Sequence, residues 1–200
     1  MVDRWWVIGD RSALVGLAVL LTQPLAAQGG VPKALESPSA PVAALATALY
    51  NDQANLREAS DSAKPAVATE VLRDRLQAAL GEQLILFPVV DSIAASPQSL
   101  KQTGGVPCNV IVKCARALGA ATGARWVVMT KVSKTSNLIW LLSAQLIRVS
   151  DGEIILDDST ELKGEPVGMI QVGVRSFANR VIRTVRNGGL ATNYPAGEPY

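Results

Sequence analysis

Three consecutive segments, 124–136, 138–149 and 153–163, constrain the fold of this chain more than any others. The first segment opens on the apolar run WVVM, which is typical of a central strand buried on both faces, and then becomes polar. Asn137 and the Ser-Asp-Gly sequence that ends at Gly152 predict the two turns between the segments. The pattern therefore predicts a meander of three strands, of which the third alternates as a half-exposed strand does.

Helical periodicity precedes and follows these strands. Residues 65–80 place apolar side chains at helical spacing, with Pro65 suited to the first helical position and Gly81 to the end. A second helix is predicted from Asn109 onward. The last helix opens at Pro166 and carries four arginines near its polar side. Its predicted apolar stripe consists of Ile170, Val174, Phe177, Ala178, Val181 and Val185.

Two segments are less clear. The composition of Val42–Tyr50 favours a helix, whereas its length and flanking residues allow a short buried strand. Residues 84–90 predict a strand, with Pro88 at a bulge or an edge position, and residues 92–107 predict a loop with one helical turn. Together the pattern predicts one α/β domain over residues 42–186, a three-layer-like mixed sheet of about five strands with two to three packing helices.

The N-terminal region has the layout of a secretory signal peptide. An apolar run at residues 12–21 is followed by polar and then small residues, which predicts a signal peptide over residues 1–27 and export to the periplasm by the general pathway. The competing interpretation, a retained membrane anchor, would bury Asp10 and Arg11 at a cost of about 3 kcal/mol each. Residues 28–41 predict a flexible lead-in and residues 187–200 a disordered tail.

The chain has two cysteines, Cys108 and Cys114. In an oxidising compartment they are expected to form a structural disulfide, which would stabilise the fold by about 2–3 kcal/mol. Their spacing matches neither a redox C-x-x-C motif nor haem attachment. A single pair without histidine is also a poor zinc site.

Histidine is absent from the chain, which excludes Ser-His-Asp and Cys-His catalysis. A serine–lysine dyad of Ser133 with Lys131 is the remaining option for a nucleophile. The two residues share a strand face but lie roughly 7 Å apart along it. No glycine-rich phosphate loop is present, so the sequence predicts neither an enzyme nor a cofactor.

The strand end formed by Lys131, Ser133, Lys134 and Asn137 is the candidate ligand site, because two lysines and an amide can bind a carboxylate or phosphate. The alternative is a solvated strand end whose lysines discourage edge pairing. The acidic residues within 157–161 are expected to form an exposed polar face and no metal site.

Several stretches resemble an uncharacterised family of small exported proteobacterial proteins, a domain of unknown function. The resemblance is carried by residues 108–119, 124–128, 131–139, 151–156 and 161–164 and by the helix from Met169 to Val181. The architecture of this family is similar to that of the amino-terminal domain of TolB and of the periplasmic domain of CsgG-type proteins. The resemblance implies a non-catalytic interaction module of the cell envelope.

The resulting hypothesis is a periplasmic protein–protein interaction or accessory module with a periplasmic or outer-membrane protein partner. The formal net charge of +2 is too small to predict a nucleic-acid partner, and no integral span is expected after signal cleavage. Two alternatives remain open. One is a module that binds a small anionic ligand at residues 131–137, and the other is an unrecognised hydrolase.

Overall fold

The computed structural model describes residues 41–51, 58–102 and 112–191. The predicted signal peptide, nearly all of the lead-in and most of the C-terminal tail therefore lie outside the described residues. Within these ranges, no helix combines the length and the apolar character needed to cross a membrane.

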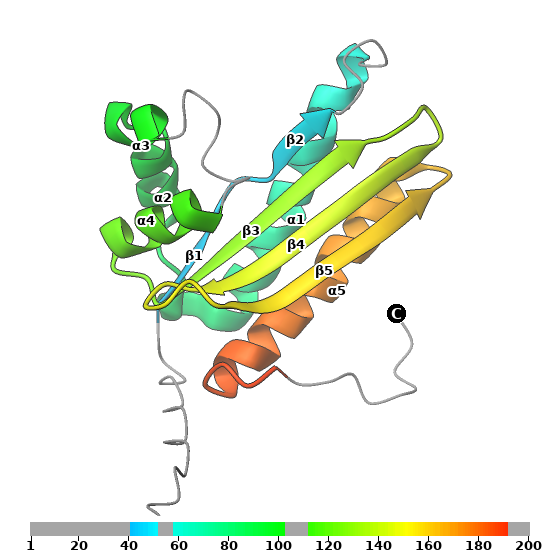
Figure 1. Ribbon diagram of the computed structural model, residues 1–200. Helices are drawn as coiled ribbons and strands as arrows, with labels where there is room; N and C mark the ends of the chain where they lie inside the picture. The colour runs from blue at the N-terminus through cyan, green and yellow to red at the C-terminus, as the bar shows by residue number, and fades with distance from the viewer. Residues whose placement is uncertain (1–40, 52–57, 103–111, 192–200) are drawn as a thin grey trace, which may run out of the picture. The chain divides into compact units, whose positions relative to one another are not determined.

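The domain is built on a mixed sheet of five strands, as predicted (Figure 1). The strand order is β1-β3-β4-β5, and β2 also pairs with β3. Both β1 and β2 run parallel to β3, whereas β4 and β5 form an antiparallel meander after it. The strands are β1 (Val42–Ala44), β2 (Ala48–Asn51), β3 (Trp126–Lys134), β4 (Ile139–Arg148) and β5 (Ile154–Lys163).

The ambiguous segment Val42–Tyr50 lies along β3 as one interrupted strand. Val42 pairs with Trp126 in β1, but Ala48 pairs with Lys131 in β2, so the register shifts by one residue between the two halves. Such a shift is typical of a bulge, which inserts one extra residue into a strand. Pairing with β3 outweighs the helix propensity of this alanine-rich segment.

Helices cover both faces of the sheet. Helices α1 (Ala63–Leu80) and α5 (Pro166–Arg186) pack side by side on one face (Figure 1). Helices α2 (Phe87–Ala94), α3 (Pro97–Gln102) and α4 (Val112–Thr122) gather beside β1 on the other. Because side chains alternate along a strand, Trp126 and Val128 of β3 enter the α1/α5 core, while Val127 and Met129 enter the α2/α4 core.

The predicted strand over residues 84–90 is wrong. Leu84 alone forms an isolated bridge, with Val42, and the chain enters α2 at Phe87. The physical reason is Pro88, which lies in the first helical turn, where a missing N–H removes no hydrogen bond. Residues 92–107, predicted as a loop with one helical turn, contain the end of α2 and the short helix α3.

The predicted end of α1 at Gly81 and the predicted stripe of α5 are confirmed, whereas α1 begins at Ala63, two residues before Pro65. Gly81 ends α1 with φ of +52°, a left-handed conformation that favours glycine. Short 3-10 helices flank α1 at Ala59–Ser62 and at Gly81–Gln83. Glu165 caps α5 by accepting hydrogen bonds from the backbone N–H groups of Val167 and Gly168. The six apolar stripe residues predicted in the last helix are all buried.

Candidate functional site

The structure divides the predicted strand-end site between the two faces of the sheet. Lys131 and Ser133 lie on one face of β3, and Lys134 lies on the α1/α5 face. The Lys131 ammonium is 5.3 Å from the centroid of the Tyr50 ring. Ser133 is 3% exposed and out of reach of a substrate, whereas Asn137 is exposed in the turn after β3. The four residues therefore do not converge on one space.

Lys134 takes part in a buried ion-pair cluster. Its ammonium lies 3.0 Å from a carboxylate oxygen of Asp61 and 3.3 Å from one of Glu58. The other Asp61 oxygen accepts a hydrogen bond of 2.9 Å from Lys64. Trp140 lies below both lysines, with its ring centroid 4.6 Å from the Lys64 nitrogen and 5.7 Å from that of Lys134. These contacts tie the start of α1 to the end of β3.

The electrostatics of this cluster favour its charged form. Burial opposes ionisation of Asp61, which is 1% exposed. The Glu58 N–H and the two lysine ammonium groups outweigh burial and lower the pKa of Asp61 from 3.8 to about 2. Desolvation likewise opposes the charge of Lys134, but its hydrogen bonds to Asp61 and Glu58 raise its pKa. The Lys134 ammonium is thus already bound by carboxylates of its own chain.

Sequence reasoning missed Asp61, because it lies in a short polar 3-10 helix before α1 that carries no apolar pattern. The signal that could have found it is the i, i+3 spacing of Asp61 and Lys64 at a helix start. The partnership with β3, 73 residues away, leaves no local signal.

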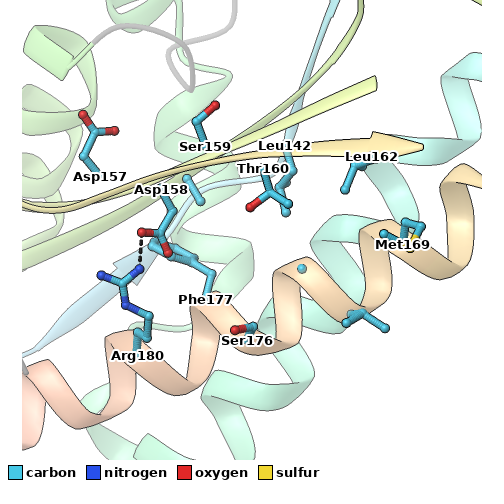
Figure 2. A pocket seen from close by; sticks show the side chains of 13 residues that line it. Leu142, Asp157, Asp158, Ser159, Thr160, Leu162, Met169, Ser176, Phe177 and Arg180 are labelled. Carbon is cyan, nitrogen blue, oxygen red and sulfur yellow. Dashed lines mark hydrogen bonds and ion pairs between the residues drawn. The ribbon is translucent and has the colours of Figure 1, made fainter. Parts of the chain in front are cut away.

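A groove of about 520 Å³ lies between β5 and α5 (Figure 2). Its floor comes from β4, one wall from β5 and the other from α5. The groove is lined by Leu142 and Ala144 of β4, by Asp157, Asp158, Ser159, Thr160 and Leu162 of β5, and by Met169, Val172, Gly173, Ser176, Phe177 and Arg180 of α5.

Several residues that line the groove have short side chains. On the helix-facing side of β5, Leu156 and Leu162 are buried, but Asp158 is half-buried and Thr160 between them is exposed. Helix α5 presents Gly173 and Ser176 here. A Cβ atom on Gly173 would come within 2.8 Å of the Leu142 Cδ2 atom, so α5 approaches β4 closely at this point. Beside that contact, the strand and the helix leave open space.

The groove is polar at one end and apolar at the other. An ion pair between Asp158 of β5 and Arg180 of α5 forms the polar end (Figure 2). Met169 and Val172 on α5 border the apolar end and are 40% and 49% exposed. Exposed apolar side chains beside a polar rim are typical of a binding surface.

Strand β5 forms an edge of the sheet among the described residues, since it pairs with β4 alone. The register with β4 is continuous from Leu156 to Lys163, and an irregularity follows at Leu146/Ile147 of β4. On the side of β5 that faces away from α5, Asp157, Ser159 and Glu161 are exposed (Figure 2 labels the first two). A strand edge therefore runs along the opening of the groove.

Two further predicted features concern metal and cysteine chemistry. In the described part of the chain, no three histidine, cysteine, aspartate or glutamate residues are placed to hold a metal ion. Cys114 is 6% exposed in the α2/α4 core. Its predicted disulfide partner, Cys108, lies outside the described residues, so the disulfide stays a prediction.

Comparison with known proteins connects the chain to a family. Residues 40–181 match the family described as "Protein of unknown function (DUF2380)", in agreement with the resemblance found in the sequence. No curated protein sequence matches the chain significantly.

Solved structures similar to the chain have low sequence identity. The LpoB C-terminal domain from Salmonella enterica is 18% identical with a TM-score of 0.42, over 63% of this chain and 84% of that domain. PelC from Paraburkholderia phytofirmans, crystallised as a dodecamer, is 12% identical with a TM-score of 0.42, over 77% and 93%. TolB from Acinetobacter baumannii is 16% identical with a TM-score of 0.40, over 78% and 30%. TM-scores of this size carry no conclusion about function.

Proposed function

The chain belongs to this family of unknown function, and we propose that it is a non-catalytic protein-interaction module of the bacterial cell envelope. The observation that carries the proposal is the β5–α5 groove, which opens along a strand edge that no other described strand pairs with and is bordered by exposed apolar side chains. Function must be argued from such a site, since a fold alone supports many functions.

The form of the groove favours a polypeptide as its occupant. Small-molecule sites enclose most of their ligand, whereas this groove is open along β5. The open side offers the backbone groups of a strand edge, which recognise extended peptides. Met169 and Val172 provide apolar contact area beside that edge.

The proposed compartment is the periplasm, reached by general export. Its support is the signal-peptide pattern over residues 1–27 together with a cysteine pair suited to an oxidising compartment. The intact mass of the protein from the periplasmic fraction should correspond to a chain that begins between Gln28 and Gly30. Treatment with a thiol alkylating reagent should leave this mass unchanged. An uncleaved chain held in the membrane would contradict this part of the proposal.

The interaction itself can be tested with a photoreactive amino acid in living cells. Placed at Val172, beside the groove, it should form a defined cross-link to one envelope protein. Val89 on α2 is the matched control, because it is a valine of similar exposure, 43% against 49%, outside the groove lining. Cross-links of equal yield and identity at both positions, or none at Val172, would contradict the proposal.

A further inference from the structure

We propose that the β5–α5 groove binds an extended segment of a partner protein that pairs with β5 as an added strand and alternates apolar with basic side chains. This inference rests on the proposed function and specifies the chemistry of its partner. It follows from the strand edge, the groove on one side of that edge and the acidic residues on the other.

The strand edge supplies the backbone contacts. From Leu156 to Lys163 the pairing of β5 with β4 is continuous, so the outer edge presents its N–H and C=O groups at regular intervals. Such an edge can accept a further strand. The register irregularity near Ile154 marks the end of this regular stretch, so we expect the added strand to pair between Leu156 and Lys163.

The groove selects the side chains on one side of the added strand. Successive side chains of a strand point to opposite faces of the sheet, so every second residue of the partner would point toward α5. That side is lined by Leu162, Val172 and Phe177, with Leu142 behind them. Thr160, the helix-facing residue of β5 that remains exposed, lies between the polar and the apolar end of the groove. Apolar side chains of the partner would therefore enter the groove.

The opposite side of the edge selects the remaining side chains. Asp157 and Glu161 are both exposed there, four residues apart on one face of β5. Their described contacts are weak ones at the surface: Asp157 accepts a hydrogen bond of 3.0 Å from Gln145, and Glu161 lies 3.6 Å from the Lys163 ammonium, which is itself 72% exposed. Lysine or arginine at every second position of the partner would face these carboxylates, because opposite charges across neighbouring strands stabilise pairing.

The same charges disfavour pairing of β5 with a second copy of itself. Strand β5 contains Asp157, Asp158 and Glu161 but only one basic residue, Lys163. Two such strands side by side would bring carboxylates of both copies together, which opposes pairing. The acidic residues thus protect the edge against self-association and at the same time favour a basic partner.

Synthetic peptides added to the purified protein test the inference. The probe is acetyl-KVKVKVK-amide, and the comparison peptides are acetyl-EVEVEVE-amide and the lysine peptide N-methylated at every second residue. Calorimetry at physiological salt should show binding of the lysine peptide, at least about tenfold weaker binding of the glutamate peptide, and loss of binding on N-methylation. Backbone amide signals of residues 156–163 should shift in NMR spectra.

A charge-reversed variant provides the sharpest test. The double substitution D157K/E161K should weaken binding of the lysine peptide at least about tenfold and improve binding of the glutamate peptide. The matched control is D74K/E82K, which makes the same change in net charge at two exposed acidic residues away from the groove and should leave both affinities within about twofold.

Several outcomes would overturn the inference. No peptide binding at millimolar concentration, equal binding of the N-methylated peptide, or equal effects of the two charge-reversed variants would each do so. Preferential binding of dodecanoic acid, with no peptide binding, would identify an acyl-chain groove instead. A specific protein cross-link at Val172 combined with failed peptide binding would leave the proposed function intact and remove only the β-strand pairing.

Discussion

Two ion-pair sites lie on the same helix-covered face of the sheet, and they differ in how much water reaches them. At the end of β3, Asp61 is 1% exposed and is held between two lysines. At the β5–α5 groove, the side chains of Asp158 and Arg180 are 23% and 25% exposed. The first site holds the start of α1 against the sheet, whereas the second borders an open space.

The difference shows which charges are available to a ligand. In the Asp61 cluster, the carboxylate accepts hydrogen bonds from both lysines and from the Glu58 backbone, so the buried charges stabilise one another. The ion pair of Asp158 and Arg180 lines the same groove as the exposed Thr160 and the exposed apolar residues of α5. The buried cluster therefore has a structural role, whereas the Asp158–Arg180 pair is partly accessible to solvent at the groove.

The largest expected effect comes from removing the charge of Asp61. Asp61→Asn leaves the ammonium groups of Lys64 and Lys134 buried without their common carboxylate. Breaking a buried ion pair from one side costs about 3–5 kcal/mol, and we expect the free energy of unfolding in urea to fall by that amount. Asp157→Asn, at an exposed carboxylate of β5, is the control and should change it by less than about 0.5 kcal/mol. Equal effects of the two substitutions would show that the cluster is not structural.

Acid should weaken the same cluster. The pKa of Asp61 is about 2 in the folded protein, against 3.8 for the ordinary carboxyl group. Between these values the unfolded chain binds more protons than the folded one, so the contribution of Asp61 is fully present above about pH 4 and is lost as the pH falls through 2. Urea unfolding between pH 5 and pH 2 should show this loss. The free energy of unfolding should fall less steeply with decreasing pH in Asp61→Asn than in the natural protein. Parallel pH dependences of the two proteins would argue against the low pKa of Asp61.

The ion pair at the groove should contribute much less to stability. Asp158→Asn removes the carboxylate partner of Arg180 where both side chains are partly in water, so the expected loss is below about 1 kcal/mol. Urea unfolding of Asp158→Asn beside Asp61→Asn measures the contrast directly. If the two variants lose equal stability, the distinction between a structural and an accessible ion pair fails.

Much of the fold could be predicted from the sequence because its signals are local. The strands β3, β4 and β5 and the helix α5 follow from apolar patterns and turn residues, and the structure confirms them. Residues 84–90 could not be assigned correctly, since their sequence LILFPVV fits a buried strand as well as a helix start. Pro88 decides the outcome through its place in the first helical turn.

The candidate site could be predicted far less well. Lys131 and Lys134 were predicted to form a cluster, yet alternation along β3 places them on opposite faces of the sheet. The ammonium group of Lys134 is paired with Asp61. The groove depends on the close approach of Gly173 of α5 to Leu142 of β4 and on the exposed Thr160 of β5. That juxtaposition is tertiary, and no spacing within either segment predicts it.

The smallest expected effect concerns Lys131, the predicted ligand residue whose described contact is the Tyr50 ring at 5.3 Å. Tyr50 is 49% exposed, and at an exposed site a cation–π contact contributes about 0.5–1 kcal/mol. We therefore expect Lys131→Ala to lower the free energy of unfolding by about 0.5 kcal/mol. Tyr50→Leu should have a similar effect, and the double substitution should add little to either, whereas Tyr50→Phe should retain the contact.

The same variant tests the anion-binding hypothesis for residues 131–137. With Lys134 bound to Asp61, Lys131 alone should hold phosphate or citrate too weakly to raise the melting temperature. A rise in melting temperature that phosphate produces in the natural protein, and that Lys131→Ala abolishes while Tyr50→Phe preserves, would contradict this. It would place a ligand on the face of β3 that carries Lys131 and Ser133, on the opposite side of the sheet from the groove.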